Sequence, residues 1–299
     1  MKSLILFLTV LLLSTTTYES LAQKEYPPNI EGAKEIVYKE IDRVTLKLWV
    51  FNPVKHQASD KKPAVVFFFG GGWNGGSPTQ FIKHCEYLAA RGMVGIVADY
   101  RVFSRHKVQA NKCVSDAKSA IRYLKINGES LGVDTAKIVV SGGSAGGHLA
   151  ACTAIIENFN EESDDLSVST IPMALILFNP VVDTGKRGYG REKMEGREFE
   201  LSPVHHITPG VPTTLIMHGK DDTTVPYENV VRFDQVMKQQ GNKCILVGYK
   251  SQKHGFFNYK RSPKHFRKTM KKTESFLEDN GLLRGETWLK KYCKELGKN

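Results

Sequence analysis

The stretch Ser141-Gly142-Gly143-Ser144-Ala145-Gly146-Gly147-His148 largely determines how the rest of the sequence is interpreted. It contains Gly-x-Ser-x-Gly, placed between the apolar run 138–141 and the small-residue run 144–156. These runs predict a strand that enters a tight turn and leaves it as a helix, and such a turn has no room for side chains at the two glycines of the motif that flank the serine. The turn holds the hydroxyl of Ser144 exposed above the sheet edge, with the helix N-terminus behind it. An ordinary glycine-rich turn is the alternative, which the strand–turn–helix setting disfavours.

Outward from this turn, short apolar runs alternate with longer amphipathic stretches. The run 64–69 reads Ala-Val-Val-Phe-Phe-Phe and leads into three glycines, as a buried central strand does. The pattern predicts an α/β fold with a mostly parallel central sheet and helices on both faces. The polar segment 184–200 is too irregular to assign, and loops of this kind are either mobile surface or part of a binding site. We expect strands at 45–51, 64–69, 94–99, 138–141, 173–178, 213–218 and 244–249, and helices at 81–91, 111–127, 144–156, 227–240, 264–278 and beyond 285.

The first residues are typical of an export signal. Lys2 supplies a positive charge, and the apolar run 4–13 is too short to span a bilayer. Ser20-Leu21-Ala22 resembles the small-x-small pattern that signal peptidase cuts, so we expect a signal peptide at 1–22. We therefore expect a secreted or periplasmic protein with no stable membrane insertion after cleavage. An uncleaved membrane anchor is the alternative, and the short apolar run disfavours it.

The remaining residues, 23–299, show no linker, repeat or low-complexity tract, which favours a single catalytic domain. The formal net charge is +11, and a basic exported protein can favour acidic polymers or surfaces. The lysines and arginines are scattered, with their densest cluster at 260–272. We interpret this cluster as the solvated face of a helix rather than a dedicated patch, and expect no nucleic-acid partner.

The chain has five cysteines, and an odd number leaves at least one free thiol in an exported protein. Their spacings fit no zinc motif. Cys85 and Cys113 fall on consecutive expected helices and could pair, but the sequence leaves their connectivity open. Cys152 lies on the apolar helix after Ser144 and is interpreted as a core residue. The five are Cys85, Cys113, Cys152, Cys244 and Cys293.

A serine hydroxyl becomes a good nucleophile only when a base takes its proton. In folds with this turn, the chain order is serine, acid, then histidine near the C-terminus. His254 lies in a short loop after the last expected strand and is our candidate base. The helix fixes the direction of His148, which is not aimed at the hydroxyl. The remaining candidates are interpreted as structural, rim or buried residues: His205, His206 and His218.

An acid must orient that imidazole, and an oxyanion hole must receive the developing charge. The run 218–226 follows an expected buried strand and offers two adjacent carboxylates, Asp221 and Asp222, which the pattern alone does not separate. The one not chosen is expected to be exposed or to cap the turn. Gly70-Gly71-Gly72-Trp73 follows the strand 64–69, where glycines let bare amides approach an ester oxygen together with the amide of Ala145. A flexible hairpin loop is the alternative.

These segments together resemble the α/β-hydrolase superfamily. In particular they resemble its exported carbohydrate acetylesterase and feruloyl-esterase-like group, often labelled acetylxylan esterases or prolyl-oligopeptidase-like. The resemblance covers nearly all of 23–299, and it implies Asp222 as the acid and the amides of Gly71, Gly72 and Ala145 as the oxyanion hole. It rests on Phe67-Phe68-Phe69-Gly70-Gly71-Gly72-Trp73, Ala98-Asp99-Tyr100-Arg101, Asp116-Ala117-Lys118-Ser119-Ala120-Ile121-Arg122, the Ser144 turn, Ser202-Pro203-Val204-His205-His206-Ile207 and His254-Gly255-Phe256-Phe257-Asn258.

The chain departs from that pattern at Phe69. Related lipases and esterases carry a histidine before the three glycines, where it supports the loop and takes no part in the chemistry. The departure therefore leaves activity in place and indicates a different packing of the loop against the acyl pocket. Tyr189 and Trp73 are candidates for shaping that pocket, with simple packing as the alternative for both.

The resemblance implies acyl transfer to Ser144, with His254 as base and then acid and Asp222 orienting it, without metal or cofactor. The expected substrate is an acetyl or hydroxycinnamoyl ester on a polysaccharide or oligosaccharide. The basic charge would suit uronate-bearing or sulfated glycans. Prolyl oligopeptidases share this kind of catalytic domain, but we expect no additional entry-restricting domain here. A non-catalytic binding module is disfavoured because serine, acid and histidine are all present.

Overall fold

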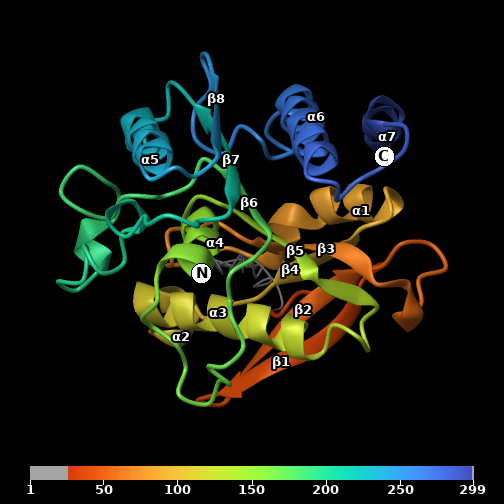
Figure 1. Cartoon of the computed structure of the whole chain (residues 1–299), viewed down its shortest axis with the longest axis horizontal. Helices are drawn as coiled ribbons and strands as arrows, with labels where there is room; N and C mark the ends of the chain where they lie inside the picture. The colour runs from red at the N-terminus through yellow and green to blue at the C-terminus, as the bar shows by residue number, and fades with distance from the viewer. Residues whose placement is uncertain (1–25, 298–299) are drawn as a thin grey trace, which may run out of the picture.

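The computed structural model describes residues 26–297, so the expected signal peptide at 1–22 lies outside the described residues. Eight strands form one sheet in the order β1-β2-β4-β3-β5-β6-β7-β8 (Figure 1). The pairs β1–β2 and β2–β4 are antiparallel, and all the other pairs are parallel. The mostly parallel sheet that the sequence predicts is therefore confirmed.

The elements have the following bounds. The strands are β1 (Lys34–Ile41), β2 (Val44–Phe51), β3 (Lys62–Phe68), β4 (Val94–Ala98), β5 (Val133–Gly143), β6 (Ala174–Phe178), β7 (Thr213–Gly219) and β8 (Cys244–Tyr249). The helices are α1 (Ile82–Ala90), α2 (Phe103–His106), α3 (Ala110–Ile126), α4 (Ala145–Ile155), α5 (Tyr227–Gln239), α6 (Pro263–Asp279) and α7 (Leu289–Leu296). Short 3-10 turns are η1 (Ala58–Asp60), η2 (Pro78–Phe81), η3 (Arg191–Lys193) and η4 (Pro203–His205).

Helices cover both faces of the sheet, as expected. One buried core contains residues of α3, α4 and α5, and the other contains residues of α1, α6 and α7. Figure 1 shows α6 and α7 beside α1 on one side of the sheet. Because β3 is covered on both faces, its run 64–68 is almost completely buried. Each of its valine and phenylalanine side chains contributes about 1.5–3 kcal/mol of burial free energy.

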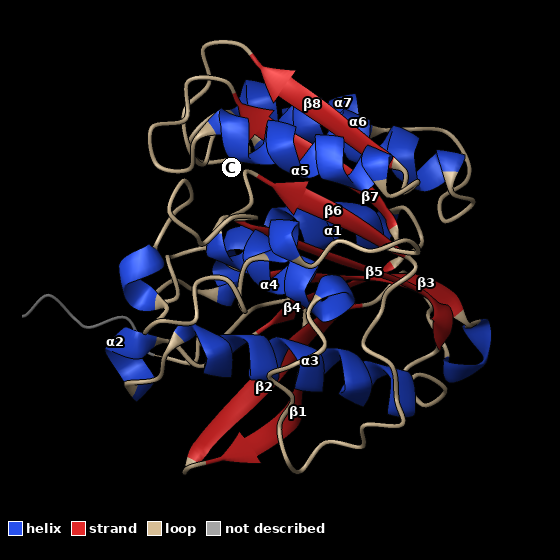
Figure 2. Cartoon of the chain, turned by 60° about the vertical axis from the view of Figure 1, so that its left-hand side comes forward, coloured by secondary structure: helices blue, strands red, loops and turns tan. Residues whose placement is uncertain are grey.

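Two elements were missed by the sequence analysis. The edge strand β1 carries charged residues on both sides of the short run Ile36-Val37-Tyr38, and its buried Lys39 forms ion pairs with Asp116 and Glu161 at 2.8 and 2.9 Å. This lysine interrupts the apolar pattern that would have revealed the strand. The helix α2 is a single turn of four residues, too short to show a periodicity. Figure 2 shows β1 and β2 at one end of the twisted sheet and β8 at the other.

A pairing of Cys85 with Cys113 is wrong. All five cysteines lie within the described residues, and none of them forms a disulfide. Cys85 lies on α1 and Cys113 on α3, and they belong to the two cores on opposite faces of the sheet. Consecutive helices in an α/β fold can cross from one face to the other, which the linear sequence does not reveal.

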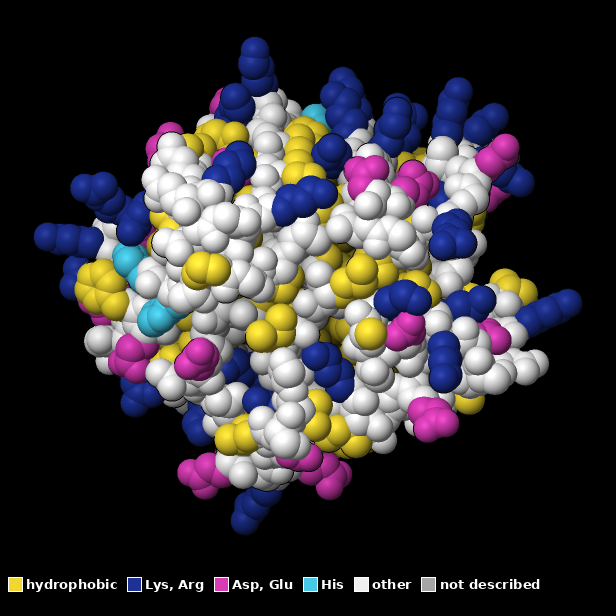
Figure 3. Space-filling model, viewed as in Figure 1, with side chains coloured by type: hydrophobic (Ala, Val, Ile, Leu, Met, Phe, Trp, Pro, Cys, Tyr) yellow, Lys and Arg dark blue, Asp and Glu magenta, His cyan; other side chains and the backbone are white. Residues whose placement is uncertain are grey.

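The basic cluster lies where the sequence analysis placed it, on the outer face of a helix. On α6, Lys264, Arg267 and Lys268 are exposed, whereas Phe266 and Met270 are buried. Figure 3 shows lysine and arginine side chains along the molecular edge over α6 and α7. Across residues 26–297, we find no helix with the length and apolar character needed to cross a membrane.

Candidate active site

Ser144 lies in the sharp turn between β5 and α4. Its backbone has φ 55° and ψ −120°, a conformation that residues other than glycine rarely adopt. The turn is also crowded, because a Cβ added at Gly142 would lie 2.3 Å from the carbonyl oxygen of Gly146. Gly143 and Ala145 are buried, and Ser144 between them is partly exposed. The local sequence therefore presents one hydroxyl to solvent at the carboxyl end of β5.

His254 follows β8 and contacts both of the other expected residues. Its Nε2 lies 2.9 Å from the Oγ of Ser144, and its Nδ1 lies 2.7 Å from Oδ2 of Asp222. Asp222 follows β7, so the carboxyl ends of three parallel strands bring the three side chains to one edge of the sheet. Asp221 is exposed, and the structure thus separates the two carboxylates that the sequence pattern left equivalent.

The surroundings of Asp222 stabilise its ionised form. Its Oδ1 accepts hydrogen bonds from the backbone N–H groups of Thr224 and Val225 at 2.9 and 3.0 Å. The Nε2 of His218 lies 3.2 Å from Oδ2. Burial acts to raise the pKa of Asp222, but hydrogen bonds from His218, His254 and the Val225 amide outweigh it and hold the pKa well below its ordinary value. The carboxylate can therefore orient the imidazole of His254 and balance a positive charge on it.

Asn179 is a residue of this site that the sequence analysis missed. It directly follows β6, and its Oδ1 accepts a hydrogen bond from the N–H of Gly255 at 2.9 Å. Its Nδ2 lies 3.5 Å from Nε2 of His254. The signal that could have revealed it is its position, since a polar residue directly after a buried parallel strand lies at the ligand-binding edge of the sheet.

The glycine loop after β3 passes beside the serine. A Cβ added at Gly70 would lie 3.2 Å from the Cβ of Ser144. Gly71 and Gly72 both have positive φ, 136° and 61°, which glycine adopts without strain. Ala145 is the first residue of α4, where a backbone N–H has no acceptor within its helix. The structure thus places the three expected oxyanion residues on the two segments that flank Ser144.

Aromatic side chains and His148 support this loop. The Nε1–H of Trp73 donates to Nδ1 of His148 at 3.2 Å, and Nε2 of that histidine lies 2.6 Å from the carbonyl oxygen of Leu201. Burial lowers the pKa of His148 to about 4, so its ring is neutral, with the proton on Nε2. Phe69 stacks on Tyr100 at 4.1 Å between ring centroids. The residue before the glycines is therefore held by ring stacking, and Trp73 within the loop by its hydrogen bond to His148.

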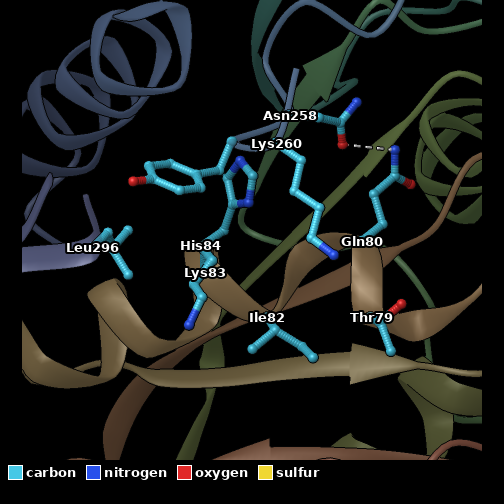
Figure 4. Close-up of a pocket in the computed structure, with 9 residues that line it drawn as sticks. Thr79, Gln80, Ile82, Lys83, His84, Asn258, Lys260 and Leu296 are labelled. Atoms are coloured by element: carbon cyan, nitrogen blue, oxygen red, sulfur yellow. Dashed lines mark hydrogen bonds between the residues drawn. The ribbon is translucent and has the colours of Figure 1, made fainter. Parts of the chain in front are cut away.

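Two amide side chains connect the glycine loop to the histidine loop, and we call Gln80 and Asn258 the amide bridge. The N–H of Gly70 donates to Oε1 of Gln80 at 2.7 Å. The Nε2 of Gln80 donates to Oδ1 of Asn258 at 3.1 Å (Figure 4), and Asn258 donates to the carbonyl oxygen of Gly255 at 2.9 Å. The bridge therefore fixes the spacing between the segment that carries the oxyanion amides and the residue next to His254.

The unassigned segment 184–200 packs against the glycine loop. The Nζ of Lys193 lies 3.4 Å from the carbonyl oxygen of Gly72 and 3.4 Å from the hydroxyl of Tyr189. Trp73 is buried and packs on Tyr189, which is half-buried, with their ring centroids 6.0 Å apart. A cavity of about 450 Å³ opens beside Gly72, and Lys193 and the half-exposed Phe103 contribute to its wall. The segment is thus part of the surroundings of the site.

The two histidines of the run 202–207 contact residues away from Ser144. His205 and His206 are exposed, and hydrogen bonds join them to Arg232 and to the carbonyl oxygen of Phe199. Among the histidines in residues 26–297, only His254 is within hydrogen-bond distance of Ser144.

Comparison with known proteins agrees with this geometry. A model of the BD-FAE family matches residues 50–184. The apo structure of Thermogutta terrifontis esterase 2 is 46% identical, with a TM-score of 0.84, and the match covers 88% of this chain and 100% of that chain. The butyrate-bound structure of the same esterase is 44% identical, again with a TM-score of 0.84 and covering 88% of this chain and 99% of that one.

Curated relatives are more distant. The probable isoprenylcysteine alpha-carbonyl methylesterase ICMEL1 of Arabidopsis thaliana is 27% identical over 74% of this chain and 50% of its own length. An acetylxylan esterase of Xylanibacter ruminicola is 26% identical over 64% of this chain and 41% of its own length. The chain spans about half the length of these curated relatives.

The sheet, its flanking helices and the match to solved esterases confirm the expected α/β-hydrolase fold. The chain belongs to the same family of α/β-hydrolase esterases as Thermogutta terrifontis esterase 2.

Proposed function

We propose that this chain hydrolyses carboxylic esters through an acyl-enzyme on Ser144. The observation that carries the proposal is the continuous contact from Ser144 Oγ to His254 and from His254 to Asp222, at 2.9 and 2.7 Å. A serine, a base and a buried acid in this order are the components that make a hydroxyl nucleophilic.

The proposed steps use these two contacts and the expected oxyanion amides. As Ser144 Oγ attacks the ester carbonyl carbon, Nε2 of His254 takes the hydroxyl proton, and the ionised Asp222 stabilises the resulting imidazolium. The amides of Gly71, Gly72 and Ala145 receive the negative charge on the carbonyl oxygen. The imidazolium then gives its proton to the departing alcohol oxygen. Water, activated by the same histidine, next attacks the acyl group and releases the acid and free Ser144.

For the substrate, we propose an acetyl or hydroxycinnamoyl ester on a polysaccharide outside the cytoplasm. The matched acetylxylan esterase and the expected signal peptide support this choice. The cavity beside Gly72 supports a sugar ligand, because it combines aromatic and amide side chains, those of Phe103, Asn74 and Gln109. Lys193 and the net charge of +11 favour a glycan that carries uronate groups, although Glu192 also lines the cavity.

The experiment measures acid release from an aryl acetate, acetylated xylan, acetylated pectin and feruloylated oligosaccharides. We expect hydrolysis of the aryl acetate and of at least one glycan, fastest for the uronate-bearing pectin. Ser144→Ala is expected to lower the rate at least about 10³-fold. Ser130→Ala alters an exposed serine and serves as the matched control. A proline-linked peptide and an isoprenylcysteine methyl ester serve as competing substrates.

Two results would contradict the proposal at different levels. If no ester is hydrolysed by the folded protein, or if Ser144→Ala retains full activity, ester hydrolysis at Ser144 is wrong. If the aryl acetate is hydrolysed but the isoprenylcysteine methyl ester or the peptide is preferred to every glycan, only the glycan assignment is wrong.

A further inference from the structure

A cavity of about 690 Å³ lies next to the candidate active site but not in it. Its wall is formed by α1, the loop after His254 and the end of α7 (Figure 4). Ser144, Asp222 and His254 do not line it, whereas the amide bridge, Gln80 and Asn258, does. Its volume is in the range of cavities that bind small molecules.

His84 lies in the wall of this cavity with unmet hydrogen-bonding groups. The residue is 1% exposed, and neither ring nitrogen has a partner within the part of the chain that the structure describes. Phe81, Phe178 and Phe266 surround its ring. Their ring centroids lie 4.9, 5.4 and 4.8 Å from the centroid of the His84 ring. Burial lowers the pKa of His84 to about 3, so the neutral ring keeps one N–H donor and one acceptor. Buried polar groups are rarely left unpaired in native proteins, and each exception requires an explanation.

The charges around the cavity are of one sign. Lys83 and Lys260 line it, and no aspartate or glutamate does. Lys83 forms an ion pair with Glu86 at 2.9 Å, but Lys260 has no carboxylate within ion-pair distance among residues 26–297. Figure 4 shows the Lys260 side chain running between His84 and Gln80. The opening therefore carries an uncompensated positive charge.

The rest of the wall is mainly apolar and includes Ile82 and Leu296. We propose that this cavity is a second binding site, which takes an organic carboxylate with an apolar body. Lys260 binds the carboxylate, Ile82 and Leu296 contact the body, and a hydroxyl on the body pairs with His84. The site does not depend on the proposed ester hydrolysis. Its occupant would touch Gln80 and Asn258, which hold the glycine loop and the histidine loop in place.

The test uses isothermal titration calorimetry on the whole chain, with cinnamate, uncharged cinnamamide and 4-hydroxycinnamate as probes. We expect cinnamate to bind one-to-one and cinnamamide to bind about fivefold or more weakly, because it lacks the charge that Lys260 recognises. We expect 4-hydroxycinnamate to bind more tightly than cinnamate. His84→Leu removes the unmet ring nitrogens and should abolish that gain.

Two further variants locate the binding. Lys260→Gln should raise the Kd for cinnamate about fivefold and leave the Kd for cinnamamide unchanged. Lys268→Gln, an exposed lysine on α6, should change neither and is the matched control. Ile82→Trp should block the cavity and abolish binding of all three probes. If cinnamate does not bind, or binds Lys260→Gln as tightly as the wild type, the proposal is wrong. The Lys260→Gln comparison decides the question even where Ile82→Trp fails to fold.

Discussion

At the scale of single residues, Asp222 is a buried carboxylate whose position and ionised state are set by the groups that contact it. Its two oxygens receive contacts from two backbone amides and two histidines, so the chain fixes both its position and its charge. Only one of these contacts, that with His254, points to the serine. The others keep the acid in place while His254 takes up and gives up a proton.

Asp222→Asn should therefore remove the charge while it preserves most of the shape. We expect kcat for an aryl acetate to fall about 10³- to 10⁴-fold, because the amide no longer stabilises the imidazolium or the required tautomer of His254. KM should change by less than about threefold, since Asp222 does not contact the ester. Asp221→Asn, on the exposed neighbour, is the control and should keep kcat within about twofold. Similar losses in the two variants would contradict the role of Asp222.

The sequence predicts the site residues that have a local signature, and it does not predict those that depend on a contact between residues far apart in the sequence. Ser144 has a local signature, and His254 follows from chain order. Asp222 could be separated from Asp221 only by resemblance, because a turn of two adjacent carboxylates does not show which one faces inward. Gln80 and Asn258 meet across 178 sequence positions, and Gln80 lies in the short turn η2 whereas Asn258 lies in the loop after His254. No periodicity can reveal such a pair.

At the scale of elements, the glycine loop has three separate supports. Trp73 is hydrogen-bonded to His148, Phe69 stacks on Tyr100, and Gln80 accepts from the first glycine of the loop. The loop follows the central strand β3, and its two rings, Phe69 and Trp73, both belong to the buried core on one face of the sheet. These supports hold the loop where Gly70 passes beside Ser144.

Gln80→Leu tests the amide bridge. The variant leaves the N–H of Gly70 and the Oδ1 of Asn258 without their partner, so the glycine loop and the histidine loop lose their fixed spacing. We expect kcat/KM for an aryl acetate to fall about tenfold, mostly through kcat, which corresponds to about 1.4 kcal/mol of transition-state stabilisation. Gln239→Leu, at the exposed end of α5, is the control. An unchanged kcat, with the variant folded by circular dichroism, would show that the bridge does not position the loops.

The same scale explains which elements the sequence predicts well. The central strands and the long amphipathic helices agree with expectation to within a few residues, because burial on both faces or on one stripe produces a clear pattern. The strand β5 begins at Val133, five residues before the expected start, because its first part is exposed and polar. Edge strands and one-turn helices lack such a pattern. The edge strand β1 and the one-turn helix α2 were missed for this reason.

At the scale of the whole molecule, two buried neutral histidines couple stability to pH. Burial lowers the pKa of His84 to about 3 and that of His148 to about 4, below the value near 6.5 of an unfolded chain. The unfolded state therefore binds more protons than the folded state below about pH 6.5. The contribution of these two neutral rings to the free energy of unfolding is complete above that pH. It is lost as the pH falls toward the pKa values that the two histidines have in the folded state. Asp99 acts in the opposite sense, because burial raises its pKa to about 6.

His84→Leu isolates one of these contributions. At pH 7.5 we expect the variant to be more stable by about 1 kcal/mol, because two buried nitrogens without partners are removed. The advantage should grow as the pH falls from 6.5 to 4.5, since only the wild type must keep a buried ring unprotonated. Urea unfolding at several pH values measures this, with His206→Gln, an exposed histidine, as the control. A constant difference between variant and wild type across this range would contradict the interpretation.

The separation of Cys85 from Cys113 by the sheet has a practical consequence. With no covalent cross-link among its five thiols, the described fold is held by burial, hydrogen bonds and ion pairs alone. Its assembly therefore needs neither an oxidant nor an isomerase to shuffle bridges. A host that keeps thiols reduced should yield the active protein as readily as one that exports it to an oxidising compartment, and reducing agents can stay in the buffer throughout purification.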